Sequence, residues 1–212
     1  PTRVRLQSLD SLSSPRRTDV KYNFFAYMAR MKLIRRWGLM KSFVTENIAE
    51  HSAQVAQLAH ALARIKNKKF GGDLNVDRIT TMALYHETSE VLTGDLPTPI
   101  KYYNKEIKES YKAIEKTANN TLIGMLPEEF REDYREIIEV DPESYEHMLI
   151  KAADKIAAYI KCVEETRSGN KEFAKAKLTL KKEVDAYRKH EEVDWFCETY
   201  LDTFNLTLDE LE

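Results

Sequence analysis

Glycine and proline are scarce in this chain of 212 residues, which has six of each. They divide the chain into segments of roughly 15 to 30 residues, in which apolar side chains recur with helical spacing. We find no segment with the alternation of a strand, no GxGxxG motif and no internal repeat. The sequence therefore predicts an all-α fold, a single helical bundle.

Long apolar runs and closely spaced cysteines are missing as well. No run approaches the ~20 apolar residues of a membrane span, and the first segment lacks the apolar centre of a signal peptide. The two cysteines, Cys162 and Cys197, lie far apart and match no metal-binding or redox spacing. We interpret them as thiols in a reducing compartment and predict a cytoplasmic protein without a membrane partner.

An excess of charge of one sign is also absent. The formal net charge is −2, so nothing in the balance favours nucleic acid as a partner. The short basic clusters "NKKF" and "TLKKEV" are more typical of solvated faces than of a nucleic-acid groove. With 42% hydrophobic residues, the length suits one soluble domain, which we place at 21–212. We interpret 1–20, rich in Ser and Arg, as a flexible N-terminal arm or a processed or vector-derived segment.

Capping signals place the expected helices along the chain. Asn47 with Glu50 three residues later forms a capping-box pattern, Asn75 can cap another helix, and Asp141 precedes Pro142 at a first helical position. The expected helices span about 22–35, 47–66, 75–94 and 105–125, a short stretch after Pro127, the segment that opens at Asp141, and a last helix from "SGN" through Trp195 and Tyr200.

Ionisable residues fall on the apolar faces of three of these helices. His51 begins a stripe with Val55 and Leu58, and His86 shares a face with Ile79 and Met82. Glu87 follows His86, Glu90 lies one helical turn further on, and Asp154 lies among Ile150, Ala157 and Ala158. If these helices converge, imidazole and carboxylate groups form a site suited to Mn, Co, Fe or Zn.

Each of these residues also has a simpler interpretation. A lone inward histidine is more often a satisfied core residue than a ligand, and Asp154 can equally be a buried partner of Lys151 or an arginine. His60, His147 and His190 lack a comparable carboxylate neighbourhood, and we interpret them as structural. Periodicity therefore suggests a metal site without deciding it.

Three stretches, "ENIAEHS", "LYHETSEVLTGDLPTPIKYYN" and "KAADKIAAYIKC", resemble the HD-domain metal-dependent phosphohydrolases. Within that superfamily the chain is similar to the bacterial 5′-deoxyribonucleotidases, from about Phe24 to Glu210. The run "SEVLTGDLPTPIKYYN", preceded by "RRWGLM", is the most specific part. The resemblance implies a single HD-domain helical bundle that hydrolyses deoxyribonucleoside 5′-monophosphates to the deoxyribonucleoside and phosphate.

The resemblance also implies roles for individual residues. Arg36 matches the arginine that orients the substrate phosphate, Trp37 the tryptophan that disfavours a 2′-hydroxyl, and Glu90 the acidic residue near the reacting water. The implied metal ligands are His51, His86, Glu87 and Asp154, and the implied nucleotide loop is Asp95, Leu96, Pro97 and Thr98. Of the ligands, His51, Glu87 and Asp154 are also expected to contact the substrate.

One departure from the family pattern stands at the signature doublet, which is His-Asp in the family and His86-Glu87 here. The charge is preserved, but the extra methylene moves the carboxylate oxygens by roughly 1 Å, where productive geometry tolerates only ~0.5 Å without compensation. We expect an enzyme that is active or partly active with altered metal preference. The alternatives are a hydrolase for deoxynucleoside triphosphates or another phosphate ester, and a nucleotide-binding protein whose catalysis Glu87 has impaired.

The C-terminal aromatic residues bear on oligomeric state. Trp195, Phe196, Tyr200 and Phe204 are placed either to cover a partner or to close the chain's own core. Family members resembling this chain tend to pair, so we expect a homodimer.

Overall fold

The computed structural model describes residues 21–101 and 103–212, with the side chains of all but residues 98 and 99. The expected N-terminal arm, 1–20, and the side chain of Thr98 lie outside the described residues. The α-helices are α1 (Phe24–Met28), α2 (Ile48–Lys69), α3 (Val76–Leu84), α4 (Glu90–Thr93), α5 (Thr98–Lys101), α6 (Lys105–Gly124), α7 (Arg131–Ile138), α8 (Tyr145–Arg167), α9 (Ala174–Tyr187) and α10 (Glu191–Tyr200). Outside these helices and short 3₁₀ turns, backbone pairing in the described residues is limited to one isolated antiparallel bridge, Arg35 with Asn47. The all-α prediction is confirmed.

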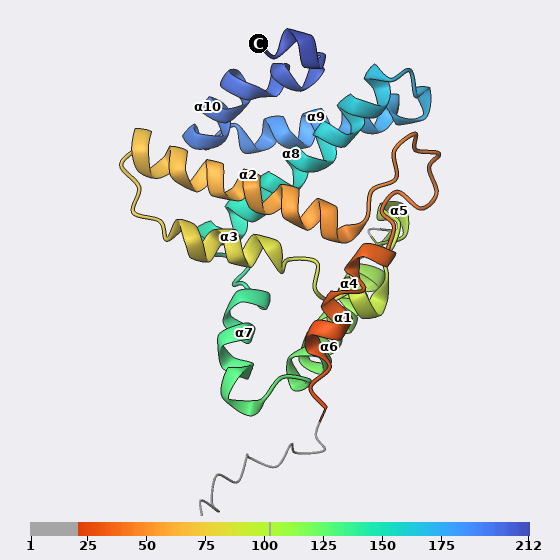
Figure 1. Cartoon of the computed structure of the whole chain (residues 1–212), viewed down its shortest axis with the longest axis vertical. Helices are drawn as coiled ribbons and strands as arrows, with labels where there is room; N and C mark the ends of the chain where they lie inside the picture. The colour runs from red at the N-terminus through yellow and green to blue at the C-terminus, as the bar shows by residue number, and fades with distance from the viewer. Residues whose placement is uncertain (1–20, 102) are drawn as a thin grey trace, which may run out of the picture.

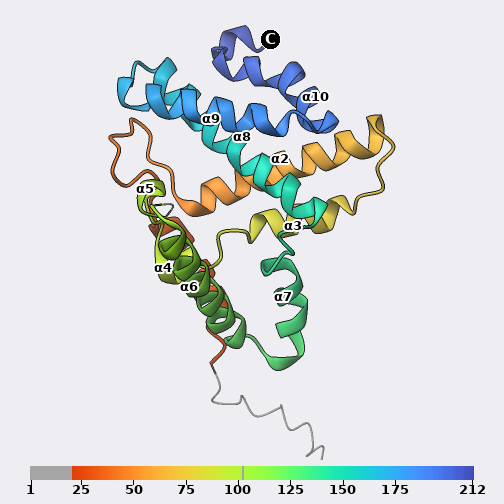
Figure 2. The ribbon, with the colours of Figure 1, turned by 180° about the vertical axis from the view of Figure 1, so that it is seen from behind.

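The larger core lies around α2 and α8, the two longest helices, which pack against each other in the upper part of Figure 1. Helix α3 covers α2, α9 covers α8, and α10 closes the end nearest the C-terminus (Figures 1 and 2). Leu62 of α2 and Ile156 of α8 are fully buried in this core. Burying an aliphatic side chain of this size stabilises the fold by about 1.5–3 kcal/mol, so this core anchors the bundle.

A second, smaller core joins α1, α6 and α7, which extend away from α2 and α8 in Figure 1. Phe24 of α1 is fully buried there against Leu122 and Ile123 of α6. Its ring lies 5.1 Å from the ring of Tyr134 in α7, in an edge-on arrangement. The segment between Leu84 and Lys105, which includes α4 and α5, connects the two cores.

Two of the expected helices are shorter than predicted. Helix α1 ends at Met28, a 3₁₀ turn follows, and Ile34 is extended, because the chain turns to pair with the start of α2. Helix α3 ends at Leu84 instead of near Gly94. There the Ala83 carbonyl accepts the Nδ1–H of His86 at 2.7 Å, and this side-chain bond competes with the helical backbone pattern.

The C-terminal half holds two further corrections. Ser144, and not Asp141, caps α8, and Asp141 instead accepts the backbone N–H of Glu143 in the preceding turn. The single last helix is wrong, since α9 ends at Tyr187 and α10 begins at Glu191. Of the four predicted aromatics, Phe196 is buried and Trp195 and Phe204 pack against the larger core, whereas Tyr200 at the end of α10 is 43% exposed. Three of the four therefore close the chain's own core and give no support to pairing.

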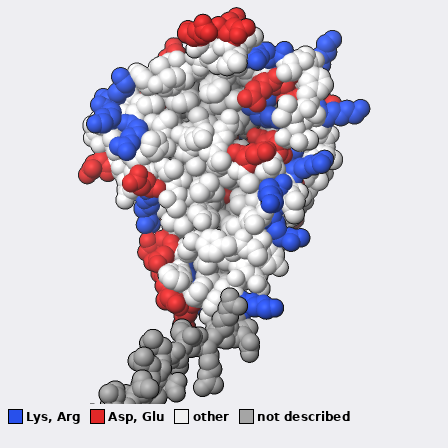
Figure 3. All heavy atoms as spheres, viewed as in Figure 1, with Lys and Arg blue, Asp and Glu red and all other residues white. Residues whose placement is uncertain are grey.

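The two cysteines and the distribution of surface charge agree with what the composition predicted. Cys162 and Cys197 are both buried and unpaired. In the part of the chain that the structure describes, no helix is long and apolar enough to cross a bilayer. On the face shown in Figure 3, Lys and Arg side chains are interspersed with Asp and Glu around a broad uncharged area.

Candidate metal centre and nucleotide pocket

Four side chains from separate parts of the chain meet between α2, α8 and the segment after α3. His51, His86, Glu87 and Asp154 each offer one ligand atom, and these atoms all lie within 4.8 Å of one another. They are the four residues for which the resemblance implied metal ligation. The tertiary structure therefore brings the whole expected set together.

His51 is placed by the start of α2. Asn47 caps this helix, and its side chain accepts the N–H of Glu50 at 3.0 Å, while Glu50 returns a bond to the Asn47 N–H, as the capping-box pattern predicts. One turn in, His51 is fully buried. Its Nδ1 accepts from Arg36 at 2.5 Å, since a guanidinium can only donate, and its Nε2–H donates to Asp154 at 3.0 Å.

His86 and Glu87 lie in the turns between α3 and α4. The ring of His86 donates from Nδ1 to the Ala83 carbonyl, which leaves the lone pair on Nε2. This Nε2 is buried without a hydrogen-bond partner and lies 3.2 Å from Oε1 of Glu87. An unpartnered imidazole nitrogen beside a carboxylate fits a cation, as does the set of two imidazoles and two carboxylates.

The protonation of these groups favours metal binding. Burial, aided by the nearby Arg36, lowers the pKa of His51, so the imidazole is neutral. Burial alone would raise the pKa of Asp154, but the hydrogen bond from His51 holds it well below the usual range. The pKa of Glu87 is likewise lowered, because the neighbouring His86 outweighs burial. A neutral His51 and ionised Glu87 and Asp154 are in the forms that bind metal. For His51 Nε2 to bind a metal, its proton would have to move to Nδ1, the nitrogen that accepts from Arg36 in this structure.

Glu90 lies beside the four-residue cluster, but it belongs to a different helix from the one predicted. We expected Glu90 on the same continuous helix as His86, one turn further along, which is wrong because α3 has already ended. Turns through 85–89 bring the chain back toward Glu87, and α4 then begins at Glu90. The Glu90 side chain is almost fully buried and is hydrogen-bonded to Glu87. Burial and the charge of Glu87 raise the pKa of Glu90 to about 10. Glu90 is therefore protonated beside the ionised Glu87.

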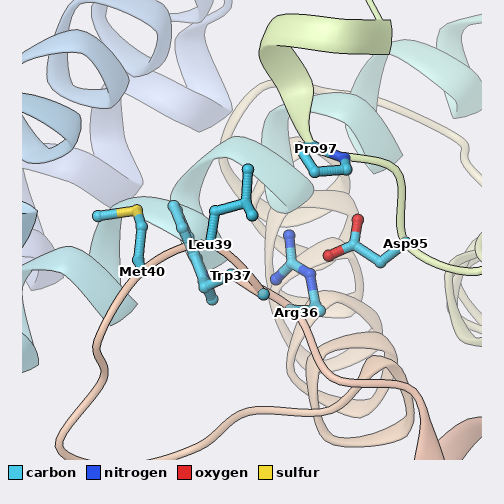
Figure 4. A pocket seen from close by; sticks show the side chains of 7 residues that line it. Arg36, Trp37, Leu39, Met40, Asp95 and Pro97 are labelled. Atoms are coloured by element: carbon cyan, nitrogen blue, oxygen red, sulfur yellow. The ribbon is translucent and has the colours of Figure 1, made fainter.

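A cavity of about 240 Å³ opens beside this cluster. It is lined by Arg36, Trp37, Gly38, Leu39, Met40, Asp95 and Pro97. Figure 4 shows the Arg36 guanidinium and the Asp95 carboxylate facing each other, with the Trp37 ring at one side and Pro97 above them. Burial raises the pKa of Asp95, although Arg36 opposes this shift. Leu96, expected in the nucleotide loop, is half-buried and does not line the cavity.

Arg36 links the cavity to the four-residue cluster through its bond to His51. The sequence left a choice between Arg36 and the adjacent Arg35. Arg35 is exposed and forms the backbone bridge with Asn47, whereas the Arg36 side chain is 15% exposed and faces the cavity. The geometry therefore favours Arg36.

Two residues outside the predicted set position the cavity wall. Glu46 accepts hydrogen bonds from both Arg36 and Trp37. On α8, Glu165 accepts the backbone N–H groups of Phe43 and Val44 at 2.9 and 3.1 Å and so anchors the loop that follows Met40. Neither residue carries a sequence signal for this role, because Glu46 merely precedes a helix cap and Glu165 lies in a charged helix end.

A family model described as 5′-deoxynucleotidase YfbR-like matches residues 23–204. The chain belongs to this family. It is 55% identical over 190 residues to a 5′-deoxynucleotidase of Vibrio vulnificus, covering 89% of this chain and 97% of that protein. It is 51% identical over 192 residues to 5′-deoxynucleotidase YfbR of Shigella boydii, covering 89% of this chain and 95% of that protein.

Two solved structures with the same fold are described as HD phosphohydrolases. One from Listeria innocua superposes with a TM-score of 0.77 at 23% identity, covering 86% of this chain and 88% of that chain. A cyanophage S-2L HD phosphohydrolase, DatZ, bound to dA and one catalytic Zn²⁺ ion, superposes with a TM-score of 0.59 at 20% identity, covering 84% and 96%. At these identities the likeness concerns the fold, and the HD-domain bundle that the sequence predicted is confirmed.

Proposed function

We propose that this chain is a metal-dependent 5′-deoxynucleotidase, which hydrolyses deoxyribonucleoside 5′-monophosphates to the deoxyribonucleoside and phosphate. The observation that carries the proposal is the convergence of His51, His86, Glu87 and Asp154 beside a cavity that holds Arg36 and Trp37. The chain matches these relatives over nearly their whole length, and both are named 5′-deoxynucleotidases. Their names support the same substrate class.

The cluster is the proposed site of one divalent transition metal, Mn, Co, Fe or Zn. When bound there, such an ion supplies Lewis acidity, which lowers the pKa of a water molecule and polarises a phosphoryl oxygen. The ionised carboxylates of Glu87 and Asp154 offset its charge. The DatZ structure, which holds one catalytic Zn²⁺ ion, supports a metal site in this fold, and add-back of each ion to metal-stripped protein identifies the metal of this chain.

Arg36 and Glu90 are the polar residues proposed to bind the phosphate and to transfer a proton. Arg36 offers a planar set of donors, which suits a phosphate dianion at the edge of the cavity next to the cluster. Glu90, protonated and in contact with Glu87, is the proposed group that donates a proton to the departing 5′-oxygen and regains one from the reacting water. The P–O5′ bond breaks, the water oxygen bonds to phosphorus, and the 5′-oxygen leaves as a hydroxyl.

The other cavity residues are proposed to hold the nucleoside. Trp37 presents its ring beside Arg36, the place where a sugar attached to the bound phosphate lies, and so excludes a 2′-hydroxyl by contact. Asp95 and Pro97 form the opposite wall and are proposed to contact the nucleoside, together with Leu96 and Thr98 of the same loop. His51, Glu87 and Asp154 approach the phosphate through the metal centre.

The test is phosphate release from dAMP, AMP and dATP by metal-stripped protein, with Mn²⁺, Co²⁺, Zn²⁺ or Mg²⁺ added back. Metal-dependent release of inorganic phosphate from dAMP, with little from AMP, is the expected result. Release of triphosphate from dATP without action on dAMP would assign the chain to the alternative triphosphate hydrolases. Thermal stabilisation by dAMP without hydrolysis under every metal would assign it to nucleotide binding.

We also propose that the protein works as a homodimer in the cytoplasm. This proposal rests on the family resemblance, since Trp195, Phe196 and Phe204 pack in the chain's own core. Light scattering on the purified protein tests the oligomeric state. A mass near twice the 24.7 kDa of the chain is expected, and a mass equal to one chain would overturn the homodimer.

A further inference from the structure

Glu46 contacts both side chains that form the Arg36 side of the cavity. Its Oε2 accepts from Nη1 of Arg36 at 3.0 Å and from Nε1 of Trp37 at 2.9 Å. A single carboxylate oxygen therefore fixes the direction of a guanidinium and of an indole. We propose that Glu46 is a positioning residue that holds the Trp37 ring where it discriminates against a 2′-hydroxyl, an inference that rests on the proposed function.

The backbone explains why Glu46 can act at this point. The two ends of the loop between Ile34 and Ile48 are pinned together, because the Arg36 N–H donates to the Glu46 carbonyl at 2.9 Å and the Ile48 N–H donates to the Ile34 carbonyl at 3.0 Å. The side chains of Arg36 and Glu46 therefore start from neighbouring points. Their ion pair has 15% and 11% of the two side chains exposed, so water competes weakly for it.

Trp37 needs such contacts more than an ordinary residue does. Its φ is +61°, in the left-handed region, which is unfavourable for a bulky side chain. The contacts that hold it there include the Nε1–Glu46 bond, a tilted ring contact with Phe173 at 5.3 Å, the Arg36 guanidinium 5.8 Å from the ring centroid, and a backbone N–H bond to Asp95. Of these, the bond to Glu46 holds the polar edge of the indole. Without it, the ring keeps its contacts with Phe173 and Arg36 but loses the bond that fixes the orientation of its polar edge.

The two bonds of Glu46 predict separable effects. A change in Arg36 alters phosphate binding, which dAMP and AMP share, and so shifts KM for both alike. A change in Trp37 alters the contact with C2′, where the two nucleotides differ. The ratio of kcat/KM for dAMP to that for AMP therefore reports on Trp37, and the common change in KM reports on Arg36.

The decisive variant is Glu46→Gln, which keeps the size of the side chain and removes its charge. Loss of a charge-assisted hydrogen bond predicts a fall of about tenfold in the dAMP-to-AMP ratio. Glu46→Asp, which keeps the charge but shortens the side chain, should lower the ratio as well. The matched control is Glu50→Gln. Glu50 lies in α2, four residues after Glu46, and its side chain accepts the Asn47 N–H. Glutamine at this position retains the capping-box pattern. Its ratio should equal that of the parent.

A second readout needs neither metal nor substrate. The chain has two tryptophans, so two indole N–H signals are expected in a ¹H–¹⁵N spectrum of the metal-free protein. Trp37→Phe assigns one of them. In Glu46→Gln the Trp37 signal should shift while that of Trp195 stays, and in Glu50→Gln both should stay.

The outcomes separate this inference from the proposed function. A parent enzyme that discriminates and a folded Glu46→Gln variant that discriminates equally well would overturn the role of Glu46 alone. An unmoved Trp37 indole signal would do the same. A parent that hydrolyses neither nucleotide would instead overturn the proposed function, and the specificity role with it.

Discussion

The imidazole of His51 donates from Nε2 to Oδ1 of Asp154 at 3.0 Å, although 103 positions separate the two residues in the chain. The bond joins α2 to α8, the central helices of the larger core. On its other side the same ring accepts from Arg36, a residue of the cavity wall. His51 therefore lies between the proposed metal centre and the proposed phosphate site, and both depend on its neutral form.

Asp154→Asn should abolish high-affinity metal binding. The amide keeps the shape but removes an ionised ligand, and we expect the affinity for Mn²⁺ or Zn²⁺ to fall at least about 100-fold, with phosphate release falling in step. Titration calorimetry on metal-stripped protein measures the change. Asp133→Asn, an exposed aspartate of α7, serves as control and should bind like the parent. Equal affinity in both variants would remove Asp154 from the ligand set.

Glu87→Asp should change which metal binds best. The variant keeps the charge and draws the carboxylate back from His86 by roughly 1 Å, a shift larger than ligand geometry normally tolerates. We expect metal binding to survive with an altered order among Mn²⁺, Co²⁺ and Zn²⁺, whereas Glu87→Gln should lose about 100-fold in affinity. Affinities for each ion, measured side by side, test this. An unchanged order in Glu87→Asp would mean that the longer side chain is fully accommodated.

Arg36→Lys should weaken substrate binding. Lysine keeps the positive charge but loses the planar fork that pairs with phosphate oxygens, so we expect KM for dAMP to rise about tenfold, equivalent to about 1.4 kcal/mol. Steady-state kinetics at saturating metal measures it. Arg35→Lys is the matched control, because Arg35 is the exposed neighbour, and its KM should not change. A rise in KM for Arg35→Lys alone would exchange the roles of the two arginines.

Acid should loosen the anchor between α8 and the cavity loop. Burial opposes ionisation of Glu165, but hydrogen bonds from Lys161, from Asn170 and from the backbone of Phe43 and Val44 lower its pKa from 4.5 to about 2. A folded-state pKa below the unfolded value means that the unfolded chain binds the proton more tightly. This contribution, about 3 kcal/mol, is therefore present above about pH 4.5 and is lost as the pH falls toward 2.

Thermal unfolding between pH 2.5 and 7 checks this contribution. The parent should be markedly more stable than Glu165→Gln at pH 7, and the two curves should approach each other at pH 2.5. Glu164→Gln, at the exposed neighbouring position, is the control and should lose no stability relative to the parent at pH 7, because the pKa of Glu164 is raised and not lowered. A constant gap between parent and Glu165→Gln across the range would contradict the lowered pKa.

Helices with strong local signals were predicted well. Asn47 caps α2 and Asn75 caps α3 as predicted, and the inward position of His51 follows from the spacing of the apolar residues behind it. Errors arose where local signals competed. Helix periodicity ran through 85–89, but side chains of His86 and Thr88 bond to backbone carbonyls there and end the helix. Asp141 and Pro142 resemble a helix start, yet Ser144 supplies the cap.

By itself, the sequence determined the helical class, the inward direction of His51 and the type of chemistry, because periodicity, caps and ligand-type residues are properties of neighbouring positions. The tertiary structure alone decided that Asp154 pairs with His51 and not with Lys151, that Arg36 and not Arg35 faces the cavity, and that Glu46 holds Arg36 and Trp37 together. These pairings join segments that are distant in the chain, so no periodicity of a single helix predicts them. They exist because packing of α2 against α8, and closure of the loop before α2, bring the side chains within hydrogen-bonding distance.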